Sequence, residues 1–69
     1  MPEGLSNRLR ELRAERDLTQ AALAELVGVS RKTINTIENG VFVPSTVLAL
    51  KLARALELPV ESLFSLDHD

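Results

Sequence analysis

Four polar side chains between residues 31 and 36 have the types and the spacing to recognise the edges of nucleic-acid bases. They share the outward side of a predicted helix over residues 31–38: Arg31, Lys32, Asn35 and Thr36. Arg or Lys can donate to guanine O6 and N7, and Asn can pair with adenine N6 and N7. This helix needs only Ile34 and Ile37 for packing. Its outward side carries two cations and no anion, which favours contact with DNA over a merely solvated helix face.

A second predicted helix, over residues 20–27, precedes this one and must position it. Gly28 stops the earlier helix because it accepts a positive φ at little cost, and Ser30 suits the N-cap of the later one. Ala24 is small enough for the two helices to approach closely. Five apolar residues form the core that sets the angle between them: Leu23, Val27, Val29, Ile34 and Ile37. Residues 20–40 therefore predict a helix-turn-helix, which places its second helix in the DNA major groove.

The rest of the chain predicts an all-α fold, a compact bundle of about five short helices in a single domain over residues 1–69. Leu and Ala dominate the apolar residues, and the β-branched residues are scattered. The first helix is expected over residues 5–16, the fourth from Ser45 or Thr46 to about residue 56, and the fifth over residues 60–64. Residues 65–69 have no helical signal, so we expect a flexible tail.

Composition argues for a recognition protein without enzymatic activity. The chain has no cysteine, no apolar run of membrane-spanning length and no signal peptide, which predicts a soluble cytoplasmic protein. His68 is the only histidine, and no carboxylates cluster with a nucleophile, so we expect no cofactor, no metal and no catalytic residue. The net charge is −2, but residues 1–56 hold all 8 Lys and Arg residues and only 6 of the 10 acidic ones. Their local field matters more to a DNA partner than the total charge.

The segment LTQAALAELVGVSRKTINTIENG resembles the phage-repressor-like, Xre/Cro-type DNA-binding domain. The resemblance continues through VPSTVLALKLARALELPVESLF and so covers about residues 5–64. It implies a five-helix bundle similar to the small stand-alone repressors of this family, which commonly bind operator DNA as homodimers. We therefore expect double-stranded DNA and a second copy of the chain as partners, with no membrane partner.

The resemblance also implies roles for individual residues. The base-contacting positions match four residues: Arg31, Lys32, Asn35 and Thr36. The phosphate-contacting residues are expected to be Gln20, Ser30, Thr33 and Asn39. Arg13 and Glu38 match a structural ion pair that joins the first helix to the end of the third.

Two apolar segments outside the helix-turn-helix are candidates for the dimer interface. Val41, Phe42 and Val43 form an apolar run in a loop, and such exposed clusters often mark contact surfaces. The alternative is that Phe42 folds back into the core. The second candidate is the C-terminal segment with Leu63, Phe64 and Leu66.

The sequence thus predicts a transcriptional regulator, a homodimeric repressor that reads a palindromic operator with its third helix. Two alternatives stay open. One is an antitoxin of the same fold, which would bind a toxin protein as well as DNA. The other is a helical protein-interaction module without DNA binding, which the −2 charge and the apolar loop support. A protein regulator is a further candidate partner.

Overall fold

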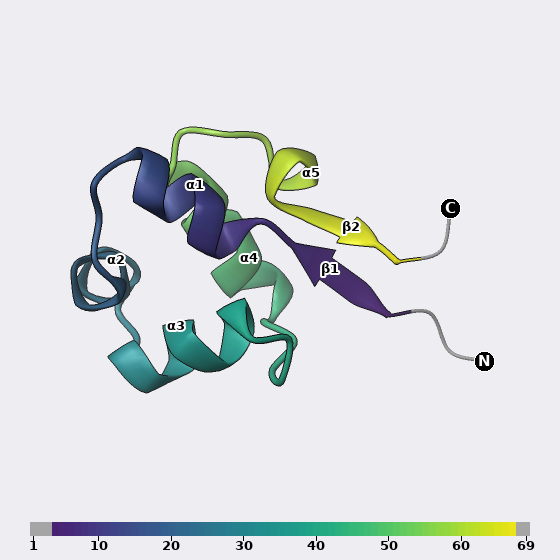
Figure 1. Ribbon diagram of the computed structural model, residues 1–69, viewed down its shortest axis with the longest axis horizontal. Coiled ribbons are helices and arrows are strands. Elements are labelled where there is room, and N and C mark those ends of the chain that lie inside the picture. The colour runs from purple at the N-terminus through teal and green to yellow at the C-terminus, as the bar shows by residue number, and fades with distance from the viewer. Residues whose placement is uncertain (1–3, 68–69) are drawn as a thin grey trace.

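The chain folds into a small helical bundle with a two-stranded sheet at one end (Figure 1). The computed structural model describes residues 4–67. Within these residues the elements follow in the order β1 (Leu5–Asn7), α1 (Leu9–Glu15), α2 (Gln20–Val27), α3 (Arg31–Glu38), α4 (Thr46–Ala55), α5 (Val60–Leu63) and β2 (Phe64–Leu66). The five helices confirm the predicted fold class.

Local signals fix where the central helices begin. The side chains of Thr19, Ser30 and Ser45 each accept a hydrogen bond from the backbone N–H three residues further on, over 3.0 to 3.1 Å. These bonds satisfy N–H groups that lack a partner inside the helix. Gly28 ends α2 in the left-handed region, at φ +76°. The structure therefore confirms the predicted cap at Ser30 and the predicted turn at Gly28 between α2 and α3.

The core lies where α2, α3 and α4 meet, with α1 and α5 closing it. Leu23, Ile34 and Leu52 have no exposed surface, and each comes from a different one of these three helices. The other buried apolar residues are Leu9, Leu12, Ala24, Val27, Ile37, Ala53, Leu56 and Leu63. Because the inner side of α3 is buried against α2, the orientation of its outer side is fixed by packing.

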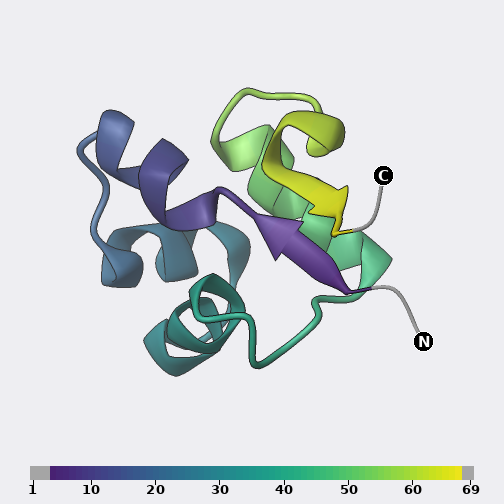
Figure 2. The ribbon, with the colours of Figure 1, turned by 45° about the vertical axis from the view of Figure 1, so that its right-hand side comes forward.

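The N-terminal segment forms a strand where a helix from Leu5 was predicted. Leu5 pairs with Leu66, Ser6 with Ser65 and Asn7 with Phe64 in an antiparallel ladder (Figure 2). The prediction was wrong because Leu5 and Leu9 are spaced as on one helix face. In the strand Leu5 is half-buried, whereas Leu9 at the start of α1 has no exposed surface.

The C-terminal prediction was wrong because the partner that orders this segment lies at the other end of the chain. The ladder holds Ser65 and Leu66 in β2, where a flexible tail was expected, and α5 ends at Leu63 instead of Phe64. Beyond the strands, the Arg8 N–H donates to Leu63 O and the Asp67 N–H donates to Gly4 O, each over 3.0 Å. The predictions for the last part of the tail and for His68 lie outside the described residues.

Two further findings concern the described part of the chain alone. Among residues 4–67 no helix is long and apolar enough to cross a membrane. Over the same residues, no group of three Asp or Glu side chains is placed so that it could hold a metal ion.

Candidate nucleic-acid interface

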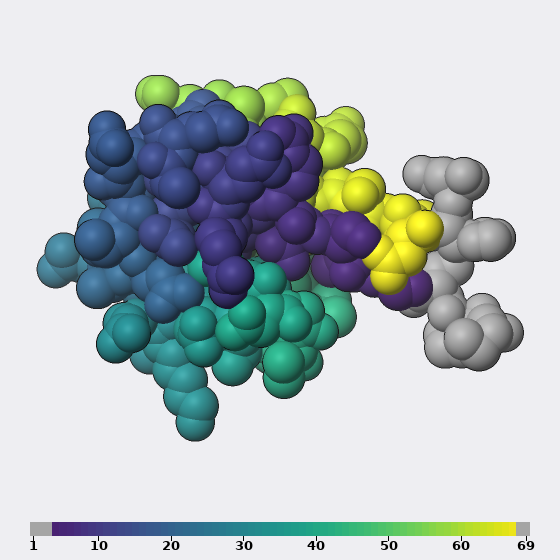
Figure 3. Space-filling view, in the orientation of Figure 1, coloured from purple at the N-terminus to yellow at the C-terminus, as the bar shows by residue number. Residues whose placement is uncertain are grey.

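The outer side of α3 is polar and open to solvent, whereas its inner side is buried. Ile34 and Ile37 are 0% and 1% exposed. Arg31, Lys32 and Asn35 are exposed and together line a surface hollow of about 300 Å³. In the space-filling view α3 forms the lower edge of the molecule, without another segment in front of it (Figure 3). Three of the four predicted base-contacting residues are thus brought together on one accessible surface.

The hydroxyl groups on α3 are largely engaged within the helix. Ser30 Oγ, which caps α3, also shares a 3.0 Å hydrogen bond with Thr33 Oγ1. That bond uses one of the two hydroxyl hydrogens, so one is left to donate to a phosphate. Thr36 Oγ1 donates to Thr33 O over 2.9 Å. Thr36 can therefore offer an outside partner its lone pairs and its methyl group, but not its hydroxyl hydrogen.

Gln20, predicted to contact a phosphate, has its amide nitrogen in two internal hydrogen bonds. Nε2 donates to Glu38 Oε1 over 2.9 Å and to Asn35 Oδ1 over 3.2 Å. A phosphate accepts but does not donate, so Gln20 must release one of these partners to bind it. The bond to the exposed Asn35 is the longer one. Gln20 therefore connects Glu38 to Asn35, one of the predicted base contacts.

The carboxylate of Glu38 is the centre of a network that joins α1, α2 and α3. Arg13 Nε lies 2.6 Å from Oε2, and Arg13 Nη2 lies 3.3 Å from Oε1. The Glu38 side chain is fully buried and the Arg13 side chain is 15% exposed. Arg13 Nη1 also donates to Leu18 O over 2.7 Å, at the connection between α1 and α2. The two residues predicted as a structural ion pair therefore lie in contact, and Glu38 Oε1 also accepts a hydrogen bond from Gln20 of α2.

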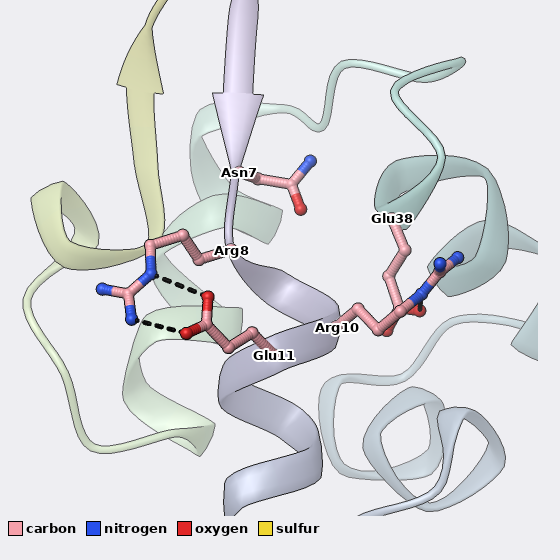
Figure 4. A pocket seen from close by; sticks show the side chains of 5 residues that line it. All are labelled: Asn7, Arg8, Arg10, Glu11 and Glu38. Atoms are coloured by element: carbon pink, nitrogen blue, oxygen red, sulfur yellow. Dashed lines mark hydrogen bonds and ion pairs between the residues drawn. The ribbon is translucent and has the colours of Figure 1, made fainter.

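Arg10 is a member of this network that the sequence analysis missed. Its Nε lies 3.3 Å from Glu38 Oε1, and its Nη2 donates to Asn39 Oδ1 over 2.8 Å. Figure 4 shows Arg10 reaching from α1 toward Glu38, beside a separate pair of Arg8 and Glu11. Arg10 lies three residues before Arg13 on the same helix face, and this spacing was the available signal. It places a cation next to Asn39, a predicted phosphate contact.

Asn7 is a second residue that the sequence analysis missed. Its Oδ1 accepts from the Leu9 N–H over 3.0 Å at the start of α1, and its Nδ2 donates to Ile37 O over 2.9 Å near the end of α3. Asn before a helix is a capping signal, but a helix that is predicted to begin at Leu5 places Asn7 inside its first turn. Asn7 thereby ties β1 to α3.

Burial raises the pKa of Glu38, but hydrogen bonds from Arg13 and Gln20, the charge of Arg13 and the hydrogen bond from Arg10 lower it more, so the net shift is downward. A carboxyl whose folded-state pKa is lowered stabilises the fold above its unfolded value of about 4.3. That contribution is lost as the pH falls through the folded-state pKa.

We therefore expect the stability difference between the wild type and Glu38→Gln to depend on pH. The difference should be largest near pH 7 and should close below about pH 4, because a protonated Glu38 is uncharged like glutamine. Urea unfolding of both proteins between pH 7 and pH 3 measures it. A difference that stays constant across this range would show that the Glu38 charge contributes nothing to folding.

The apolar segments outside α3 differ in accessibility. Phe42 is 46% exposed, so the alternative in which it folds back into the core is wrong. Leu63 is 1% exposed, so its place in the predicted dimer interface is also wrong, because it belongs to the core. Phe64 packs partly against that core, and Leu66 is 51% exposed. Of the C-terminal candidates, Leu66 alone is well exposed.

Comparisons with known proteins give a consistent result. The family model for Helix-turn-helix, HTH_3, matches residues 9–63. The chain is 42% identical over 65 residues to the uncharacterized HTH-type transcriptional regulator YgzD of Bacillus subtilis (strain 168), which covers 94% of this chain and 98% of YgzD. The structure is similar to the restriction-modification controller protein C.AhdI from Aeromonas hydrophila, with TM-score 0.76, 42% identity, and coverage of 80% of this chain and 83% of that one. It is also similar to the P22 c2 repressor protein in complex with a synthetic operator, with TM-score 0.76, 33% identity, and coverage of 78% and 82%.

Proposed function

Since the chain belongs to the helix-turn-helix family HTH_3, we propose that it is a transcriptional regulator that binds double-stranded DNA sequence-specifically, with α3 in the major groove. The observation that carries this proposal is the outer side of α3. There Arg31, Lys32 and Asn35 line one accessible hollow on a helix whose opposite side is buried. A rigid helix that presents two cations and an amide can donate to guanine and pair with adenine.

The phosphate contacts flank this surface on both sides of α3. Ser30 lies at the N-terminus of α3, where free N–H groups and the helix dipole favour an anion. Asn39 lies at the other end, where Arg10 adds a positive charge. Gln20 contributes from the start of α2. Contacts of this kind position the protein without reading sequence.

We further propose that the protein acts as a homodimeric repressor on a palindromic operator. The P22 c2 repressor, to which the chain is similar, forms a complex with an operator. Among residues 4–67, large apolar side chains also remain exposed: Leu26, Val41, Phe42, Val43, Val47, Leu50 and Leu66. A second copy that covers part of this surface would place two α3 helices in successive major grooves, about 34–36 Å apart. Such a dimer would block polymerase sterically.

Selection of bound duplexes from a random pool at low salt tests this proposal. We expect one enriched sequence with two-fold symmetry and half-sites about 10–10.5 base pairs apart. An enriched but asymmetric site would contradict the homodimer while leaving DNA recognition intact. A pool without enrichment would contradict DNA recognition and would agree with a protein-interaction module.

Replacement of Gln20 by alanine should weaken binding to every duplex by a similar factor. A phosphate contact carries no sequence information. A hydrogen bond to a charged group contributes about 1.5–3 kcal/mol, and the net loss should be smaller because Gln20 gives up an internal hydrogen bond to make the contact. Titration of the variant against the selected duplex and a set of singly substituted duplexes measures this. A loss confined to one base pair would instead mean that Gln20 acts by orienting Asn35, to which it is hydrogen-bonded.

A further inference from the structure

A second hollow, of about 320 Å³, adjoins the outer side of α3 and differs from the first in its apolar walls. Its lining residues are Lys32, Thr33, Thr36, Val41 and Phe42. Lys32 also lines the polar hollow with Arg31 and Asn35. The apolar hollow therefore continues the proposed DNA-contacting surface from α3 onto the loop that follows it.

The two threonines in this wall offer methyl groups more readily than hydroxyl groups. Thr36 Oγ1 donates to Thr33 O, and Thr33 Oγ1 is engaged with Ser30 Oγ. Both side chains are half-buried. The two threonines therefore add apolar surface to the α3 wall, beside the Lys32 side chain.

The opposite wall is held in place by the backbone of α3. The N–H groups of Val41 and Phe42 both donate to Thr36 O, over 2.9 and 3.2 Å. Their side chains are nevertheless 77% and 46% exposed. Apolar side chains fixed in solvent beside a recognition surface are preorganised for an apolar partner, since their backbone is already ordered before binding.

We propose that this hollow receives the 5-methyl group of a thymine in the bound DNA, which makes Phe42 a determinant of sequence specificity; the inference rests on the proposed function. In the major groove thymine presents the acceptor O4 beside its 5-methyl group. That combination matches the Lys32 ammonium beside the apolar wall. Cytosine presents a donor amino group and no methyl group, so it fits neither feature.

Replacement of single thymines by deoxyuridine tests this, because it removes the methyl group and keeps O4. For the wild type and the selected duplex we expect one thymine in each half-site at which deoxyuridine weakens binding about fourfold, the factor for one buried methyl-sized group. Phe42→Ala removes this contact in both half-sites of the proposed dimer, so it should bind the thymine duplex about sixteenfold more weakly. It should also bind the thymine and deoxyuridine duplexes equally. Val41→Ala should reduce the ratio of the affinity for the thymine duplex to the affinity for the deoxyuridine duplex.

Lys51→Ala is the control, because Lys51 is an exposed residue of α4 that lines neither hollow of the α3 surface and is not among the exposed apolar residues proposed for the dimer. It should keep the fourfold ratio. If Phe42→Ala still binds the thymine duplex about fourfold more tightly than the deoxyuridine duplex, the inference is wrong. If sedimentation shows in addition that this variant loses its oligomeric state, Phe42 belongs to a protein interface instead.

Failure of the inference differs visibly from failure of the proposed function. If no thymine methyl group matters but binding stays tight and sequence-specific, the apolar hollow is not part of the recognition surface. If neither the wild type nor any variant binds a duplex at low salt, both proposals are wrong.

Discussion

Replacement of Glu38 by alanine should remove a large part of the stability of this small domain. The carboxylate is fully buried and pairs with Arg13, which is 15% exposed and belongs to another helix. Removal of one member of a buried pair leaves the other charge uncompensated and typically costs about 3–5 kcal/mol. Since small domains are stable by only about 5–15 kcal/mol, urea unfolding should show a large drop in the midpoint.

The exposed pair of Arg8 and Glu11 provides the matched control. These residues also form an ion pair, at 3.1 Å, but both side chains are more than half exposed. Solvent screens such pairs, so Glu11→Ala should leave the unfolding midpoint nearly unchanged. If Glu38→Ala and Glu11→Ala had equal effects, the network around Glu38 would not be what joins α1, α2 and α3.

Replacement of Arg31 by alanine should relax specificity at one base pair of each half-site. Arg31 is exposed on the outer side of α3, where a guanidinium can donate to both O6 and N7 of a guanine. Loss of one such contact costs about 1–3 kcal/mol, and the variant should discriminate poorly among bases at that position only. A panel of duplexes, each with one substituted base pair, measures the effect at every position.

Arg54→Ala controls for the loss of a positive charge as such. Arg54 is exposed on α4, and it lines a hollow with Glu25 and Lys51 that is separate from the outer side of α3. Its replacement should leave the discrimination at every base pair unchanged. If Arg31→Ala and Arg54→Ala changed the discrimination among bases in the same way at every base pair, Arg31 would act through general electrostatic attraction.

The sequence predicted the fold best where the determinants are local. Caps at Thr19, Ser30 and Ser45 and the left-handed Gly28 fix α2, α3 and α4 from neighbouring residues, and all four are present in the structure. The strands β1 and β2 were missed because each is three residues long and its partner lies at the other end of the chain. Nothing near Leu5 indicates that it will pair with Leu66.

In the candidate site, too, features with local determinants could be predicted, whereas contacts between distant residues could not. The outward residues of α3 follow from helical spacing, because a helix that buries Ile34 and Ile37 must expose Arg31, Lys32 and Asn35. The further hydrogen-bond partners of Glu38 could not be predicted from the helical spacing of α3, since Arg10 belongs to α1 and Gln20 to α2. The position of Phe42 depended on two backbone bonds to Thr36 O, which no residue pattern reveals.

The central claim is that the outer side of α3 reads DNA sequence. Its most direct test is the affinity of the wild type for the selected duplex and for a scrambled duplex of the same composition, measured across a salt series. We expect affinity for both duplexes to fall steeply as salt rises, and the selected duplex to bind at least about 1,000-fold more tightly at physiological salt. Equal affinity for the two duplexes, or no binding at low salt, would contradict the claim.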